Sequence, residues 1–143
     1  MIAIDSNLLL YAHNSAAPEH PRARSWLEAT LSTDSAVGLP LVSILAFLRI
    51  STNPRLPKPS YSPSAAMAVV QRWLERDNVS VLEPGERHWR ILADVMADSK
   101  SSGARVTDAH LAALAIEHGA TLCTNDRDFR RFPLLDVRFP LAG

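Results

Sequence analysis

Four aspartates stand where an α/β protein concentrates its chemistry: Asp5, Asp108, Asp126 and Asp128. Carboxylate oxygens are the ligands that Mg²⁺ and Mn²⁺ prefer. Carboxylates that converge repel one another and raise each other's pKa unless a cation lies among them. A cation held there lowers the pKa of bound water, orients a phosphodiester and offsets the charge that builds up during in-line displacement. The four acids therefore predict a divalent-metal site.

Hydroxyl and amide side chains flank these acids and are suited to orient them through hydrogen bonds: Ser6, Asn7, Thr107 and Thr124. Helix capping is a simpler alternative, and taken singly it explains any one of the aspartates. The combination favours a shared site, because capping alone does not require acids at the ends of separate strands and helices.

The elements that must position these acids are two strand and helix units. Residues 2–4 read as a short strand that runs into Asp5 and then an apolar helical stretch at 8–12. At the other end of the chain, Thr107 is a candidate N-cap and Asp108 falls in the first helical turn, where a negative charge suits the helix dipole. Gly119 is the expected stop of that helix, and residues 120–123 read as a buried strand. Open α/β sheets carry their sites beyond the carboxyl ends of strands, which is where Asp5 and residues 124–129 lie.

The chain between these units alternates helices and strands. Helices are expected at 18–31, from Leu41 to a stop at 53–54, from a Ser62 cap and Pro63, and from Pro84. Strands are expected at 36–39 and 79–82, with an edge strand at 134–139. The apolar stripes expected to face the core are Leu41, Ile44, Leu45 and Leu48, then Met67, Val70 and Leu74, then Trp89, Leu92 and Met96. Residues 53–63, rich in proline, read as a rigid loop. The pattern predicts one α/β domain over residues 1–143, with a mainly parallel, doubly wound central sheet flanked by helices.

Composition fits a globular domain of ordinary size. The 143 residues are 47% hydrophobic and 21% charged, and the formal net charge is zero, so no overall field indicates a nucleic-acid or membrane partner. No apolar stretch is long enough to span a membrane, and Asp5 interrupts the first one, which argues against a secretory signal. The single cysteine, Cys123, is expected to be a buried hydrophobe in a cytoplasmic protein.

Other chemically able side chains have ordinary explanations. Arg127, Arg130 and Arg131 either hold a phosphate backbone or pair with neighbouring acids. The histidines show no zinc-ligand spacing; those at 13 and 20 are expected on the surface, and the one at 110 partly buried. The three tryptophans are core candidates first and base-stacking candidates second: Trp26, Trp73 and Trp89.

Three segments together resemble a known family. The opening Asp5-Ser6-Asn7, the segment VTDAHLAALAIEHGATL with TNDRDF after it, and LVSILAFLRISTNPR at 41–55 look like a PIN domain, and more narrowly like the VapC toxins of type II toxin–antitoxin systems. The resemblance implies a Rossmann-like fold, a ribonuclease that depends on Mg²⁺ or Mn²⁺, a homodimer, and inhibition by a cognate VapB antitoxin. It implies that Asp5 and Asp108 are principal metal ligands, and that Asp126, aided by Asp128, completes the acidic pocket.

One departure from the family is clear. PIN nucleases usually carry a glutamate on the helix after the second strand, where this chain has Ala46-Phe47-Leu48, and no acid occurs from residue 35 to residue 74. Fewer fixed charges predict that the resting site holds one Mg²⁺ or none. Arg49 is expected either to approach the scissile phosphate or to pair with an acid on the surface.

Two alternatives to the endoribonuclease stay open on the sequence. The first is a degenerate PIN module that binds RNA or protein without cleavage, which the missing glutamate suggests. The second is a phosphohydrolase with Asp5 as nucleophile, in which Asn7 stands where that class has a second aspartate. The RNA that is cut and the identity of the antitoxin are not encoded in these patterns.

Overall fold

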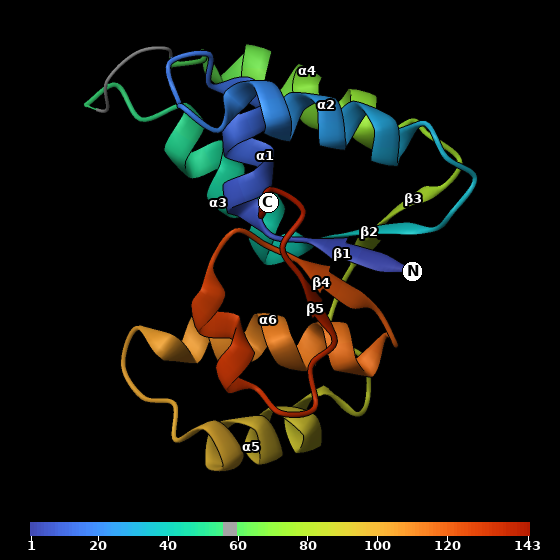
Figure 1. The fold of residues 1–143 in the computed structure, drawn as a ribbon, viewed down its shortest axis with the longest axis vertical. Coiled ribbons are helices and arrows are strands. Elements are labelled where there is room, and N and C mark those ends of the chain that lie inside the picture. The colour runs from blue at the N-terminus through green and yellow to red at the C-terminus, as the bar shows by residue number, and fades with distance from the viewer. Residues whose placement is uncertain (56–59) are drawn as a thin grey trace.

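The computed structural model describes residues 1–55 and 60–143, so part of the predicted loop at 53–63 lies outside the described residues. A five-stranded sheet forms the centre, in the order β3-β2-β1-β4-β5 (Figure 1). Its strands are β1 (Ile2–Ile4), β2 (Val37–Pro40), β3 (Val79–Leu82), β4 (Thr121–Cys123) and β5 (Val137–Arg138). All four neighbouring pairs are parallel, as the alternation of strands and helices predicted.

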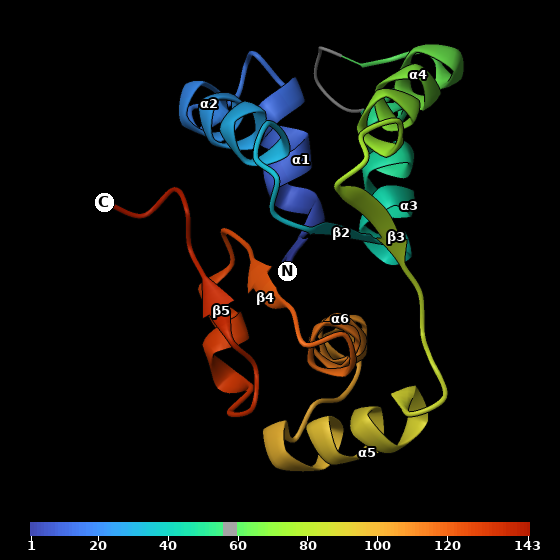
Figure 2. The same cartoon turned by 90° about the vertical axis from the view of Figure 1, so that its right-hand side faces the viewer.

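Helices cover both faces of this sheet. They are α1 (Ser6–His13), α2 (His20–Leu31), α3 (Leu41–Ser51), α4 (Pro63–Leu74), α5 (His88–Ser99) and α6 (Arg105–Glu117), with a 3₁₀ helix η1 (Arg127–Arg131) after β4. Helices α1 to α4 lie on one side, and α5 and α6 on the other (Figures 1 and 2). Each side has its own apolar cluster, one containing Leu8, Phe47 and Trp73, the other Leu114, Leu122 and Phe129. The fold is therefore the predicted α/β architecture.

The local signals that the sequence offered were mostly correct. The Ser62 side chain accepts a hydrogen bond from the backbone N–H of Ala65 at 3.2 Å, which makes it the N-cap of α4. Gly119 has a φ of +64° just after α6, a conformation that favours glycine. Cys123 is buried, and burial raises the pKa of its thiol to about 11. These positions were predictable because each depends on neighbours within one turn of the chain.

The predicted core stripes were partly wrong. Leu45 in α3 is 55% exposed and Leu41 is 38% exposed, while Phe47 is fully buried. In α4 the buried residues include Val69 and Trp73 rather than Met67 and Leu74. Apolar residues occur nearly all round both helices, so the sequence period did not define which face meets the sheet.

The predicted start of two helices and the predicted burial of one tryptophan were also wrong. Helix α5 begins at His88 rather than Pro84, and Trp89 is 76% exposed. Helix α6 begins at Arg105, with Ala104 at its N-cap, so Thr107 is an exposed residue of the first turn instead of a cap. In the described part of the chain no helix is both long and apolar enough to cross a bilayer.

Candidate active site

Two adjacent strands bring the first and last thirds of the chain together. Strand β1 pairs with β4, and Ile4 lies opposite Cys123 in the register. The chain continues from these residues into Asp5 and Thr124, and the backbone N–H of Asp5 donates to the carbonyl of Cys123 at 3.0 Å. Helix α6 precedes β4 and runs in the opposite direction to it (Figure 1), so its N-terminal turn, which contains Asp108, lies at the carboxyl edge of the sheet. Parallel topology is thus what gathers the predicted acids.

Hydrogen bonds fix Asp5 on both of its oxygens. Oδ1 accepts the backbone N–H of Ser6 at 2.7 Å, so Asp5 does cap α1. Oδ2 accepts the Thr124 hydroxyl at 2.7 Å and the Asn7 amide at 3.3 Å. The Asn7 amide also donates to the Thr124 hydroxyl oxygen at 3.1 Å. Asp5 therefore combines capping with a defined orientation at the sheet edge, and the two predicted roles do not exclude each other.

The loop after β4 is tied to the same group of residues. The backbone N–H of Asn125 donates to the Asn7 side-chain oxygen at 3.1 Å, and the N–H of Asp126 donates to the Thr124 hydroxyl at 3.0 Å. Asp126 in turn caps η1 by accepting the N–H of Asp128 at 2.9 Å. Thr124 is fully buried, which explains why its hydroxyl oxygen is shared among so many partners.

The acids influence each other's ionisation. Burial raises the pKa of Asp5, and the charges of Asp108 and Asp126 raise it further, against the hydrogen bonds from Thr124 and Ser6. Burial also raises the pKa of Asp108, and so do the charges of Asp126 and Asp128. The predicted acids are therefore neighbours, and the negative charge that they concentrate is not fully compensated by the chain.

Asp5 and Asp108 share a pocket of about 180 Å³, with Ser6 and Thr107 also on its lining. Asp126 and Asp128 do not line this pocket. Among the described residues no three acidic, histidine or cysteine side chains lie together as a ready-made metal cluster. Asp5 and Asp108 thus lie in one pocket, and Asp126 lies near enough for its charge to raise the pKa of both.

Helix α3 forms the other wall of the pocket, with Val42, Ser43, Ala46, Arg49 and Ile50 on the lining. Of the two positions considered for the missing family glutamate, Ala46 faces the pocket. Phe47 is fully buried among the side chains of the core. Ser43, which the sequence analysis did not single out, is buried and lines the pocket. A lone serine within an apolar helix was the signal that could have found it.

The donor set fits a hard divalent cation. Asp5 and Asp108 offer carboxylate oxygens in one pocket, and a cation there would relieve the repulsion that raises both pKa values. The potential metal ligands on the pocket lining are all oxygen atoms, and no histidine or cysteine, the ligands typical of zinc sites, is among them.

The three arginines after β4 are not paired with acids within the described residues. The guanidinium groups of Arg127 and Arg130 lie 5.5 Å and 4.8 Å from the centre of the Phe139 ring. Arg131 donates to the Ser99 carbonyl at 3.2 Å, and its charge lowers the pKa of Asp108. The predicted pairing with neighbouring acids is therefore wrong for the geometry seen.

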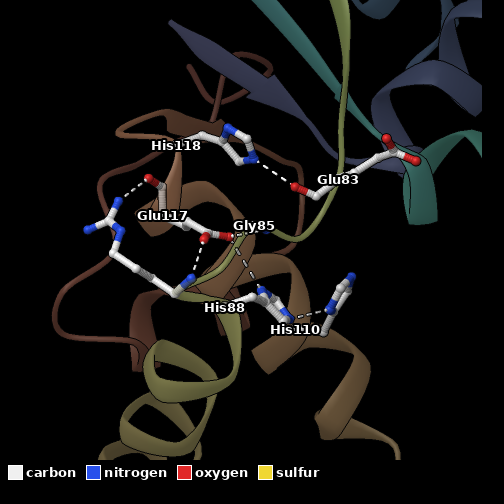
Figure 3. A network of polar contacts seen from close by, with 7 residues as sticks. Glu83, Gly85, His88, His110, Glu117 and His118 are labelled. Carbon is white, nitrogen blue, oxygen red and sulfur yellow. Dashed lines mark hydrogen bonds and ion pairs between the residues drawn. The ribbon is translucent and has the colours of Figure 1, made fainter.

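A second polar network lies at the other end of α6 (Figure 3). Glu117 accepts the backbone N–H groups of Gly85 at 2.8 Å and Arg87 at 3.0 Å, and these bonds lower its pKa. Buried His88 has its Nε2 3.0 Å from Nδ1 of His110. The network ties the β3–α5 loop to α6, so its evident role is to hold the helix that carries Asp108.

Two of the predicted surface histidines have structural roles. His13 packs edge-on against Phe47 and Trp73, with ring centres 5.6 Å and 5.3 Å away, and burial lowers its pKa. His20 is half-buried, and its Nδ1 lies 2.8 Å from the Tyr11 carbonyl. The surface prediction was wrong because the loop around residue 61 and helix α4 cover the end of α1, a long-range contact that the sequence does not encode locally.

The amino-acid sequence is similar to proteins of a known family along nearly its whole length. The PIN domain family model matches residues 2–135. The chain is 38% identical to a VapC ribonuclease of Mycobacterium bovis over all of this chain and 97% of that protein, and 36% identical to ribonuclease VapC33 of Mycobacterium tuberculosis over 99% of each. It belongs to the VapC family of PIN-domain proteins.

Solved structures agree on the fold. The VapBC2 complex of Rickettsia felis, bound to promoter DNA, matches with a TM-score of 0.71 at 16% identity, over 96% of this chain and 98% of that chain. Mycobacterium tuberculosis VapC20, a toxin that cleaves the sarcin–ricin loop, matches with a TM-score of 0.65 at 16% identity, over 97% of this chain and all of that one. At such identities the likeness concerns the fold alone.

Proposed function

We propose that residues 1–143 act as one PIN-like domain, an endoribonuclease toxin that cleaves RNA phosphodiester bonds with Mg²⁺ or Mn²⁺. The observation that carries the proposal is the pocket shared by Asp5 and Asp108, in a chain related along its full length to VapC ribonucleases. A cognate VapB-type antitoxin neutralises the enzyme, a homodimer is the expected form of the free toxin, and the cytoplasm is its expected location.

Each acid has a distinct part in the proposed site. Asp5 and Asp108 hold the cation directly, because both line the pocket and both have raised pKa values. Asp126 does not line the pocket, and its assignment as the third ligand rests on the family resemblance, with Asp128 adding negative charge near Asp108. When bound, the cation supplies Lewis-acid activation of water and of the scissile phosphate. Asn7 and Thr124 keep the Asp5 carboxylate turned toward the pocket.

Metal-dependent cleavage is the direct test of this function. Wild type is expected to cut single-stranded RNA in Mg²⁺ or Mn²⁺ and not in chelator, and Asp108→Asn is expected to lose cleavage by a factor of 10² or more, as on removal of a group that stabilises transition-state charge. Asp77→Asn, which changes an exposed aspartate in the loop before β3, is the matched control and should cut normally. Cleavage that persists in chelator would refute the metal-dependent mechanism.

One alternative retains support from a specific observation. The α3 wall has no acid, and the described residues hold no ready-made three-ligand cluster, as expected of a PIN module that only binds RNA or protein. RNA binding without cleavage at any Mg²⁺ or Mn²⁺ concentration would favour that module. The phosphohydrolase alternative loses ground, because the Asn7 side chain bridges Asp5 and Thr124 and offers no second carboxylate.

A further inference from the structure

The α3 wall of the pocket presents a short polar track. Ser43, Ala46 and Arg49 recur at a spacing of three residues, and all three line the pocket that contains Asp5 and Asp108. Side chains three apart on a helix lie on the same face. The Ser43 hydroxyl, the small Ala46 side chain and the Arg49 guanidinium group therefore follow one another along α3. They line the same pocket as the two acids.

Ser43 is unusual within this track. Its side chain is 2% exposed, and its hydroxyl has no hydrogen-bond partner in the structure. Buried polar groups nearly always have a partner, and an unpaired one in a native fold calls for an explanation. Because Ser43 is among the residues that line the pocket, a ligand group that enters the pocket beside it would supply the missing hydrogen-bond partner.

Arg49 supplies the charge. It lies in the last turn of α3, it is exposed, and none of the described residues pairs with it as an acid within 4.0 Å. The nearest acids along the chain are far away, since none occurs from residue 35 to residue 74. The surface ion pair that the sequence allowed is therefore not formed, and the guanidinium group is available to a ligand.

We propose that Arg49, together with the Ser43 hydroxyl, binds a phosphate group of the RNA beside Asp5 and Asp108. The inference rests on the proposed ribonuclease function and names the side chains that receive its substrate. Guanidinium matches phosphate with two parallel hydrogen bonds, and Ala46 leaves room where a longer acid would approach the same phosphate and repel it. The α3 wall thus lacks the negative charge of the usual family glutamate and carries the positive charge of Arg49.

RNA binding measured without metal tests this assignment separately from cleavage. Fluorescence anisotropy of a labelled single-stranded RNA, titrated in chelator across a salt series, gives the affinity and its salt slope. Arg49→Ala is expected to weaken binding roughly tenfold, since hydrogen bonds to charged groups are the strong ones. Its salt slope is expected to fall by about 0.7, the value for one lost phosphate contact on a single strand. Ser43→Ala should weaken binding about threefold with an unchanged slope.

The controls separate a lost contact from a lost fold. Arg90→Ala removes another exposed arginine, on α5 on the far side of the sheet from α3, and should change neither quantity (Figure 2). Arg49→Lys keeps the charge and should retain most of the slope while losing part of the affinity. Thermal melting of Arg49→Ala and Arg49→Lys should match wild type, because Arg49 is exposed and forms no ion pair among the described residues.

The outcomes discriminate between the two proposals. An Arg49→Ala protein with unchanged RNA affinity or an unchanged salt slope overturns the assignment, and that is also the result expected if Arg49 instead binds an acidic group of a protein partner. If Ser43→Ala binds RNA with unchanged affinity, Ser43 does not contribute to phosphate binding. A wild type that binds RNA through Arg49 but cuts none with any metal leaves the assignment standing and refutes the nuclease function.

Discussion

At the scale of single residues, Asp5 contributes unfavourably to the free energy of folding. Its carboxylate is buried, and the negative charges of Asp108 and Asp126 lie nearby, so its pKa is raised. The folded state then binds the proton more tightly than the unfolded chain, whose aspartate pKa is near 3.8. The resulting destabilisation is absent below that value and grows as pH rises through the folded pKa.

Asp5→Asn is therefore expected to stabilise the metal-free protein at neutral pH by at most about 1 kcal/mol, because relief of the buried charge exceeds the loss of the hydrogen bonds that one carboxylate oxygen accepts, and it should weaken metal binding. Thermal unfolding in chelator measures the first effect, and calorimetric titration with Mn²⁺ measures the second. Asp77→Asn, far from the pocket, should change neither. If Asp5→Asn bound Mn²⁺ as wild type does, Asp5 would not be a ligand.

Ala46 offers a second test at residue scale. It is half-buried at the pocket lining, whereas Phe47 is fully buried, so only Ala46 can accept a glutamate without disrupting the core. An added carboxylate about 4 Å from a cation contributes between about 1 and 4 kcal/mol per unit charge. Ala46→Glu is thus expected to tighten Mn²⁺ binding roughly tenfold in a calorimetric titration. Ala46→Gln, of the same length without the charge, is the control, and equal affinity in both variants would contradict the electrostatic argument.

At the scale of elements, contacts at its C-terminal end help to hold α6 in position. Glu117 at its C-terminal end holds the backbone of the β3–α5 loop, and a Cβ on Gly85 would lie only 2.6 Å from the Glu117 carboxylate. A side chain at this position would therefore have to displace the Glu117 carboxylate from its hydrogen bonds. Since Asp108 lies in the first turn of the same helix, the loop contact helps to fix one metal ligand from a distance.

Glu117→Gln is expected to lower the free energy of unfolding at neutral pH by about 1 kcal/mol, because an amide offers a single acceptor oxygen to two N–H donors. The pKa of Glu117 is lowered from 4.5 by those hydrogen bonds, so the ionised form stabilises the fold above that pH, and the effect is lost as pH falls through the folded pKa. Chemical denaturation between neutral and acidic pH measures the difference. The stability difference between Glu117→Gln and wild type should disappear at acidic pH. Glu86→Gln, in the same loop and exposed, should be as stable as wild type at every pH.

The same elements show what the sequence could and could not predict. The carboxyl ends of β1, β3 and β4, the Ser62 cap and the Gly119 stop depend on local chemistry and were predicted correctly, whereas the edge strand predicted at 134–139 is only Val137–Arg138. The convergence of Asp5 and Asp108 followed from parallel topology, and that too was predictable. The inward face of α3 was not, because Leu45 and Phe47 are equally apolar and only the packed neighbours distinguish them. The unpaired Ser43 hydroxyl required coordinates for the same reason.

At the scale of the whole molecule, positive and negative charges balance overall but are unevenly distributed. The formal net charge is zero, so no overall field draws RNA to the protein. Acids gather at one edge of the sheet, while Arg49 from α3 and Arg105 and Arg131 beside Asp108 lie around them. Nucleic acid is therefore attracted at short range only, and Arg49 on the α3 wall offsets part of the negative charge of Asp5 and Asp108 where a phosphate would bind.

The molecule also exposes more apolar helix surface than its sheet requires to be covered. Leu41 and Leu45 on α3 and Met67 and Leu74 on α4 are between 38% and 55% exposed. Large exposed apolar groups that recur on neighbouring helices are typical of surfaces that meet another protein. Co-expression with the small reading frame beside its own gene is expected to give a hetero-complex in light scattering, with RNA cleavage suppressed. Separation under mild denaturant and refolding of this chain alone should restore cleavage, because only the partner has been removed. A chain that stays free of its co-expressed neighbour, or a complex as active as the free chain, would contradict the proposed antitoxin control.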